Sequence, residues 1–242
     1  MGKQLVVLDF WTVASAHIPR AIAFMGLHRR MLKREPKLNF WKLLGTGSGQ
    51  SFTMRDSDPR QWGLLTVWED PSDYESFKHS LVLSQWTEIA IQSAHFELEP
   101  LSAKGVWQNQ TPFEPQDVAK WRGPTAALTR ARIKPQWWVS FWRSIPPVSA
   151  DLNQTPGLVT SVGIGEAPIG LQGTFSVWQT NQAITEFASR RQPHQKVVER
   201  TAQTGWYAEE LFARFKIHSA TGTLGGVELS SLLNAPSGGS DG

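Results

Sequence analysis

The sequence predicts an α+β fold built from one structural unit that occurs twice along the chain. Segments 65–101 and 174–215 share an order: an apolar strand ending in Val-Trp, a helical stretch, and a strand that mixes acidic and apolar residues. Trp68 and Phe77 of the first segment recur as Trp178 and Phe187 with the same spacing. Such self-similarity indicates a supersecondary unit used twice.

Each half shows the order strand, helix, strand, strand, helix, strand, which is the ferredoxin-like βαββαβ pattern. In this pattern a four-stranded antiparallel sheet carries its helices on one face, so the other face needs a cover. A second copy of the unit supplies that cover. We therefore expect tandem ferredoxin-like repeats whose sheets pack face to face and form a pseudo-dimeric α+β barrel.

The elements of the first half follow from local patterns. Residues 4–10 are apolar and rich in strand-forming types. Residues 18–34 form a basic, partly amphipathic helix that Pro36 ends, and its basic face is either solvated or in contact with a membrane surface. The other elements are assigned in the same way, to strands 39–44, 62–69 and 95–104 and to a helix that starts at Asp70-Pro71.

The second half repeats these elements, beginning with a strand at 124–133. The helix at 134–152 carries several large aromatic residues, namely Trp137, Trp138, Phe141 and Trp142. These side chains either pack on the sheet or line a membrane contact or a tunnel mouth. A strand at 171–178 and a closing strand after residue 206 flank a helical region that Pro193 interrupts.

The domain boundaries follow from composition. The first ferredoxin-like half is assigned to 1–107 and the second to 124–218. Residues 108–123 are polar and contain two prolines, which is typical of a linker. Residues 219–242 end rich in Gly and Ser, so we expect a flexible C-terminal tail.

Composition narrows the functional class. The 242-residue chain carries a net charge of +3 and no cysteine, which excludes disulfides, zinc ribbons, iron–sulfur clusters and thiolate-ligated haem. The basic residues are scattered and no nucleic-acid-binding motif occurs, so we expect no nucleic-acid partner. There is no long apolar run and no signal-peptide pattern, so we expect a cytoplasmic protein.

Two local patterns suggest chemistry only at first sight. The glycines at 45–49 lack the following helix that a dinucleotide fingerprint requires, so a hairpin is the better interpretation. His95, Glu97 and Glu99 alternate along a strand, as metal ligands would, but an exposed strand face explains them equally well and is favoured. Hydrolase and phosphotransfer signatures are absent from the sequence.

His194 stands out because it lies where the two copies differ most, directly after Pro193. It is either a structural histidine or the axial ligand of a haem, which needs a neutral imidazole on a rigid element. Arg190 and Arg191 lie close before it and are suited to pair with haem propionates.

Several stretches together resemble the spheroidene monooxygenase family. They are FWKLLGTGSGQSFT at 40–53, the strand at 62–70, PTAALTRARI at 124–133, VGIGEAP at 162–168 and WYAEELFARF at 206–215. The resemblance implies a haem enzyme that uses O2 and an external reductant such as reduced ferredoxin to form a keto group on an acyclic carotenoid of the spheroidene type.

The resemblance also implies an axial histidine on the second helix of the later half, the position of His194. Arg130 and Arg132 are then expected to face the iron or its propionates. We expect the porphyrin to lie between the two sheets, and we leave open a peripheral contact with the inner photosynthetic membrane. Two alternatives remain: the same haem fold with a dehydratase or peroxidase-like reaction on another apolar substrate, or a cofactor-free ligand-binding or stress-response module.

Overall fold

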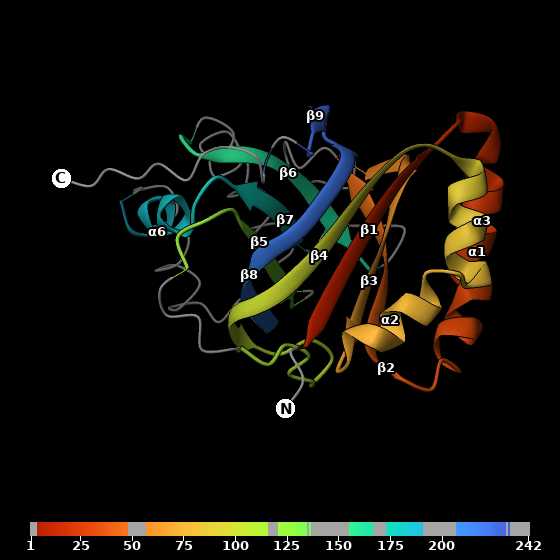
Figure 1. Cartoon of the computed structure of the whole chain (residues 1–242), viewed down its shortest axis with the longest axis horizontal. Helices are drawn as coiled ribbons and strands as arrows, with labels where there is room; N and C mark the ends of the chain where they lie inside the picture. The colour runs from red at the N-terminus through yellow and green to blue at the C-terminus, as the bar shows by residue number, and fades with distance from the viewer. Residues whose placement is uncertain are drawn as a thin grey trace.

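The computed structural model shows a barrel of strands with helices on opposite sides (Figure 1). It describes residues 4–47, 57–115, 121–134, 136, 155–166, 173–190, 207–230 and 232. The strands join in the order β4-β1-β3-β2-β6-β7-β5-β8-β9, and an additional pairing of β4 with β8 closes β1 to β8 into a barrel. The predicted α+β barrel is confirmed.

The first half contains the complete βαββαβ order. Its elements are β1 (Leu5–Val13), a 3-10 turn (Ser15–His17), α1 (Ile18–Leu32), β2 (Leu38–Gly47), β3 (Ser57–Trp68), α2 (Pro71–Phe77), α3 (Leu81–Ile89) and β4 (Ala90–Gly105). Asp70 begins α2 by accepting a hydrogen bond from the backbone N–H of Ser72 at 2.8 Å. Ser80 begins α3 by accepting one from Leu83 at 3.3 Å. This second cap divides the single helix predicted after Asp70 into two.

The second half repeats the strands in the same order. Its described elements are β5 (Thr125–Ile133), β6 (Leu158–Gly165), β7 (Gly173–Trp178), α6 (Asn181–Arg190), β8 (Tyr207–Leu224) and the short β9 (Val227–Glu228). The helix predicted at 134–152, with its aromatic residues, lies almost entirely outside the described residues.

One hydrogen bond marks equivalent positions in the two halves. Trp68 pairs with Leu5 across β3 and β1, and its Nε1 donates to Thr66 Oγ1 at 2.9 Å. In the second half Trp178 pairs with Thr125, and its Nε1 donates to Ser176 Oγ at 2.9 Å. The repeat inferred from the sequence is therefore also a repeat of strand register.

We call β1 to β4 the first sheet and β5 to β8 the second sheet. The two sheets meet edge to edge as well as face to face. Gly45, Thr46 and Gly47 of β2 pair with Gly165, Ile164 and Gly163 of β6. The second seam, between β4 and β8, is much longer and runs from Ala94 and Gly222 to Gly105 and Leu211. The two halves of the predicted barrel are therefore joined by hydrogen-bonded strands into one continuous sheet.

The C-terminal tail begins later than the sequence suggests. Instead of ending near residue 218, β8 continues to Leu224, with Ala220 and Gly222 paired to Phe96 and Ala94 of β4. The side chains of Ala220 and Leu224 are buried in the barrel, so the strand is held by its apolar inner face. Residues 233–242 lie outside the described part of the chain.

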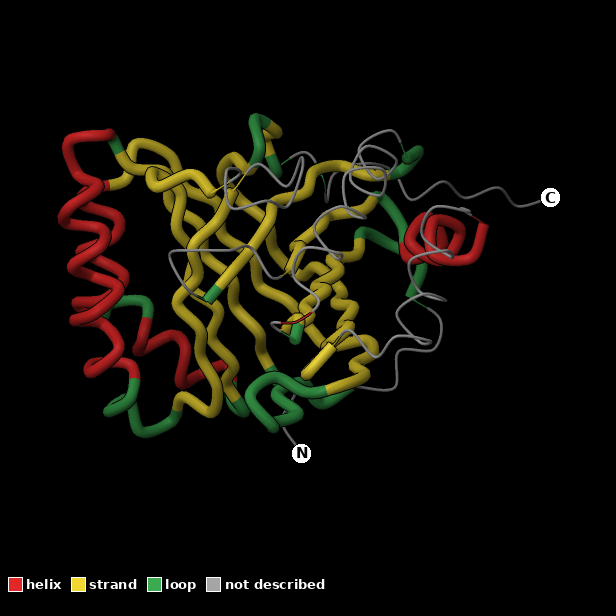
Figure 2. Tube along the Cα trace, turned by 180° about the vertical axis from the view of Figure 1, so that it is seen from behind, coloured by secondary structure: helices red, strands yellow, loops and turns green. Residues whose placement is uncertain are grey.

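Apolar side chains fill two main layers. One lies inside the barrel and includes Phe10, Phe96, Phe175 and Phe215. The other lies between the first sheet and helices α1 to α3, which Figure 2 shows as one layer along the strands. A third and smaller cluster around Trp178 and Ile184 lies between the second sheet and α6. Most of the large apolar side chains therefore lie inside the barrel and on the outer face of the first sheet.

Candidate functional site

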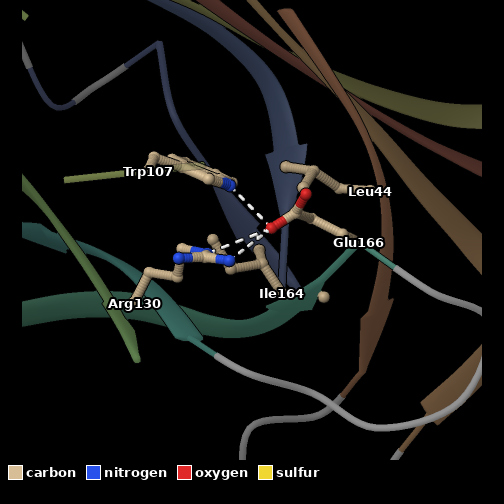
Figure 3. A pocket seen from close by; sticks show the side chains of 6 residues that line it. Leu44, Trp107, Arg130, Ile164 and Glu166 are labelled. Atoms are coloured by element: carbon tan, nitrogen blue, oxygen red, sulfur yellow. Dashed lines mark hydrogen bonds and ion pairs between the residues drawn. The ribbon is translucent and has the colours of Figure 1, made fainter. Parts of the chain in front are cut away.

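A buried cluster of charged side chains lies where β5, β6 and β8 converge (Figure 3). Arg130 of β5 is its centre, with 4% of its side chain exposed. Its Nη1 donates to Glu209 Oε2 at 2.8 Å. Its Nη2 and Nε both donate to Glu166 Oε1, at 2.7 and 3.1 Å. The guanidinium therefore ties together two carboxylates from different strands.

A tight turn at residues 107–110 completes this cluster. Trp107 Nε1 donates to Glu166 Oε1 at 2.6 Å. Gln108 and Asn109 both have positive φ, 53° and 59°, as the central residues of a type I′ turn do. Their backbone N–H groups donate to Glu209 at 3.3 and 3.2 Å. The carboxylate of Glu209 thus offsets the cost of two non-glycine residues in the left-handed region.

Lys42 brings a second cation to the cluster from β2. Its Nζ lies 3.3 Å from Glu166 Oε2 and donates to the side-chain oxygen of Gln108. It also lies over the rings of Phe40 and Trp107, at 4.9 and 5.6 Å from their centroids. Burial lowers the pKa of Lys42, and the nearby charge of Glu166 opposes this shift.

The four charges compensate one another. Burial alone would raise the pKa of Glu209, but hydrogen bonds from Arg130 and from the Gln108 backbone outweigh it and lower the pKa. The adjoining pocket, lined by Leu44, Trp107 and Ile164 among others, holds about 170 Å³, part of it open to solvent. Pockets for cofactors and drug-sized ligands typically hold about 300–1,000 Å³. This cluster therefore suits a role in locking the barrel wall, and the pocket is too small for a porphyrin.

The outer faces of the two sheets differ sharply at equivalent positions. On the first sheet Trp41 pairs with Thr66, and Leu43 pairs with Leu64. On the second sheet the corresponding pairs are Ser161 with Ser176 and Gly163 with Thr174. Val7 and Trp11 of β1 correspond in the same way to Ala127 and Ala131 of β5. The second sheet has lost the large side chains that fill the first.

Helices cover the large residues of the first sheet. Trp11 stacks on Trp86 of α3 with ring centroids 5.2 Å apart, and Phe24 of α1 meets the same ring edge-on at 5.3 Å. On the outer face of the second sheet, the described residues form one small apolar cluster around Trp178 and Ile184. Thr129, in the middle of β5, is exposed. The described residues of this face therefore carry smaller side chains than their equivalents on the first sheet.

Arg214 of β8 lies on this outer face beside Ala127. Its Nη1 donates to Asn181 Oδ1 at 3.1 Å and to Thr185 Oγ1 at 3.0 Å, both on α6. Burial lowers the pKa of its guanidinium, and within the described ranges no carboxylate pairs with it. The equivalent position in the first half is occupied by Glu97, which pairs with Val7. A half-buried cation with only neutral partners is suited to binding an anion.

The histidine suggested as a metal ligand has other partners. His95 Nδ1 lies 2.7 Å from Asp9 Oδ1, and Glu97 lies 3.5 Å from the other ring nitrogen. Glu99 instead meets His218 at 2.7 Å. In the part of the chain that the structure describes, no group of three His, Asp or Glu residues is placed to hold a metal ion.

Comparison with known proteins places the chain in a family. It is 34% identical over 212 residues to spheroidene monooxygenase of Rhodobacter capsulatus, covering 86% of this chain and 88% of that protein. It is 37% identical to the protein of that name from Cereibacter sphaeroides, covering 78% of this chain and 58% of its longer relative. The homologue from Rubrivivax gelatinosus is 35% identical over 75% of this chain. The chain belongs to the spheroidene monooxygenase family.

Membership in this family makes the chain a monooxygenase, an oxidoreductase, as the resemblance implies. No family model matches the chain. Among solved structures, aldoxime dehydratase in complex with butyraldoxime is similar in fold, with a TM-score of 0.55 at 8% identity over 89% of this chain and 80% of that one. At so low an identity the likeness concerns the fold alone.

The structure reaches only some of the site residues predicted for a spheroidene monooxygenase. Arg191 and His194 lie outside the described residues, and Arg190 is the last residue of α6. Arg132 is 54% exposed and lies 3.9 Å from Glu209. The guanidinium of Arg130 is bound to Glu166 and Glu209, and its expected place beside the iron or the propionates stays a prediction.

The described residues of the barrel offer no open interior for the porphyrin that was expected between the sheets. Its interior is packed with apolar side chains, and Phe10, Phe96 and Phe175 contact one another there. The residues that sequence reasoning missed are Lys42, Trp107 and Glu166. Glu166 lies inside the VGIGEAP stretch, so an acid directly after a glycine-rich strand was the available signal. No helix in the described part of this chain has both the length and the hydropathy needed to cross a bilayer.

Proposed function

We propose that this chain is a haem-dependent monooxygenase that uses O2 to form a keto group on an acyclic carotenoid. The observation that carries the proposal is the outer face of the second sheet. There Ser161, Gly163 and Ala131 stand where the first sheet has Trp41, Leu43 and Trp11. The strands are the same in both halves, but the side chains on the outer face of the second sheet are smaller, and this provides room for a large flat group.

The residues on this face fit a porphyrin with carboxylate substituents. Small side chains allow a planar ring to approach the strands, and Arg214 supplies a cation without an acidic partner in the described chain. We assign His194 as the axial ligand and Arg190 and Arg191 as partners of the propionates. Arg190 is the last residue of α6, which flanks this face, and Arg191 and His194 follow it in the sequence. When bound, haem supplies the activation of dioxygen that side chains cannot provide.

The substrate assignment rests on the family. The curated relatives carry the name spheroidene monooxygenase, so an acyclic carotenoid of this type is the proposed substrate. Electrons would come from reduced ferredoxin or a similar donor, because insertion of one oxygen atom from O2 requires two electrons from outside. The exposed apolar surface of Phe212, 41% exposed on β8, is available for contact with a polyene on this face.

The test has two parts. Protein purified from haem-supplied cells should show a Soret band, and the same band should appear when haem is titrated into apoprotein. His194→Ala should lose haem retention, while His79→Ala, which replaces an exposed histidine on another element, should keep it. A protein without a Soret band, or a His194→Ala variant with an unchanged spectrum, contradicts the cofactor assignment.

The reaction is tested in a host that accumulates spheroidene. Expression of the chain should convert the pigment to a keto carotenoid, and this conversion should stop without O2. Haem binding without a change in pigment would leave the cofactor assignment intact but would remove the carotenoid reaction. The same-fold alternative of a dehydratase or peroxidase-like enzyme would then be favoured.

A further inference from the structure

The outward face of α1 has an unusual arrangement of side chains. Its N-terminal part exposes mainly apolar residues, with Ile22 56% and Leu27 58% exposed, and its one partly exposed cation, Arg20, is paired with Glu88. The other exposed positions on this part are Pro19, Ala23 and Gly26. Large apolar side chains this exposed on the same helix, without a charged neighbour between them, form a patch that water solvates poorly.

The C-terminal part of the same face is basic. Four exposed cations follow the apolar patch within two turns: Arg29, Arg30, Lys33 and Arg34. Other cations nearby are neutralised, because Arg20 pairs with Glu88 at 2.7 Å and Lys37 pairs with Asp73. The four on this face form no ion pair within the described residues, so their charge is available to a partner.

Helix α3 extends this surface. His28 contacts Gln85 at 2.8 Å and Arg20 contacts Glu88, so α1 and α3 lie antiparallel. Leu81, at the first turn of α3 and 57% exposed, therefore lies toward the basic end of α1. Figure 1 shows α1 and α3 on the side of the barrel away from α6. The surface combines exposed apolar and basic residues on a rigid helical layer.

We propose that this surface, formed by α1 and the first turn of α3, docks on an anionic lipid bilayer. Ile22, Leu27 and Leu81 would enter the boundary between headgroups and acyl chains, and the four cations would bind lipid phosphates. An acidic protein would satisfy the charges alone. The exposed apolar residues favour lipid, since they gain only when they leave water. Docking here leaves the second sheet and α6 facing away from the bilayer surface.

Vesicle sedimentation with the full chain tests this proposal without haem or carotenoid. The protein should bind vesicles of phosphatidylcholine with one quarter phosphatidylglycerol, and binding should weaken with added salt. Arg30→Gln with Lys33→Gln should weaken binding at least about tenfold, since each cation near an anionic surface contributes about fivefold. Lys104→Gln with Arg122→Gln removes two exposed cations elsewhere and should leave binding unchanged.

The apolar part has its own readout. Because the chain has no cysteine, Leu27→Cys can carry a single polarity-sensitive dye, with Thr111→Cys as an exposed control in the loop after β4. The dye at position 27 should shift to the blue on vesicles and the control should not. Ile22→Ser with Leu27→Ser should weaken binding by at least about tenfold. Absence of vesicle binding overturns the proposal. Binding that weakens with salt while the dye at position 27 shows no blue shift also overturns it, because the apolar residues then stay in water. In that case an acidic protein becomes the favoured partner.

Discussion

Arg130, Glu166 and Glu209 are buried together, and each charge is compensated only while its partners are present. Glu209 is held by the guanidinium and by two backbone N–H groups, and Glu166 by the guanidinium, by Trp107 and by Lys42. Desolvated charges of this kind contribute little net stability as a set, but a missing partner leaves an uncompensated buried charge on Glu209, whose side chain is only 4% exposed.

Removing Arg130 should therefore cost far more than removing its exposed neighbour. We expect Arg130→Met to lower the free energy of unfolding by about 3–5 kcal/mol, because it leaves the buried carboxylate of Glu209 without its close cation, while Lys42 still lies 3.3 Å from Glu166. Arg132→Met should lower it by less than about 1 kcal/mol, because Arg132 is 54% exposed and only 3.9 Å from Glu209. Urea unfolding of both variants measures the difference. Equal losses would show that the cluster does not lock the barrel.

The pair of Asp9 and His95 predicts a pH dependence of stability. Burial alone would lower the pKa of His95, but the hydrogen bond and charge of Asp9 outweigh it and raise the pKa above its ordinary 6.5. Burial also raises the pKa of Asp9. Both groups thus hold protons more tightly in the folded state, and their contribution is present at low pH and lost as the pH rises through the raised values.

We expect the free energy of unfolding to fall as the pH rises above about 6.5, because His95 then loses the proton that it holds more tightly in the folded state. The double variant Asp9→Asn with His95→Gln should show a flatter profile over this range. Urea unfolding at several pH values measures it, with His79→Gln as the control because His79 is exposed. A double variant with the wild-type slope would assign the pH dependence to other groups.

At the scale of elements, the barrel depends on the seam between β4 and β8. Gly222 of β8 has a φ of 79°, and a Cβ built there would lie 2.1 Å from the carbonyl oxygen of Ser93. Only glycine allows this approach of the two strands. Ala220 and Leu224 on either side are buried, so the strand cannot shift outward without exposing them.

Gly222→Ala should therefore destabilise the protein by more than about 1 kcal/mol, since alanine fits neither the backbone angle nor the space. Gly26→Ala is the matched control. Gly26 lies in the exposed face of α1 with no atom within 4 Å of the added methyl, so the same change should stabilise by roughly 0.5–1 kcal/mol. Thermal unfolding compares the two. A neutral Gly222→Ala variant would show that β8 can leave the seam at this point.

The periodicity of apolar residues predicted the helices and strands better than it predicted where they end and which strands pair. The repeat of Trp68 and Trp178 predicted the order of elements in each half, and the structure adds that the two tryptophans occupy equivalent ladder positions. The extension of β8 could not be predicted, since Gly222 and the polar residues around it resemble a loop until β4 is beside them. The same holds for Glu166 and Lys42, which are far apart in sequence and meet only because β2 pairs with β6.

The molecule as a whole is a pseudo-symmetric barrel whose two outer faces have diverged. The first face is filled by tryptophans against α1 to α3, and the second keeps Trp178 but replaces most of the others by small residues. Because the barrel interior is packed, a large cofactor can be accommodated only on such a face of the described fold. Under the proposed function, this difference between the two outer faces is what makes room for the cofactor.

Refilling the second face tests this view of the whole molecule. Thr129 is exposed in the middle of β5, between Thr174 and Phe212 on the neighbouring strands. We expect Thr129→Trp to fold normally, because the new ring enters open space, and to bind haem at least about tenfold more weakly, because the ring occupies the position proposed for the porphyrin. Ser84→Trp on the exposed face of α3 is the matched control and should leave haem binding unchanged. Haem titration followed at the Soret band, together with far-UV circular dichroism of the apoproteins, separates loss of binding from loss of fold. Haem affinity that is the same in both variants would move the cofactor away from the second sheet, even if His194 remains its ligand.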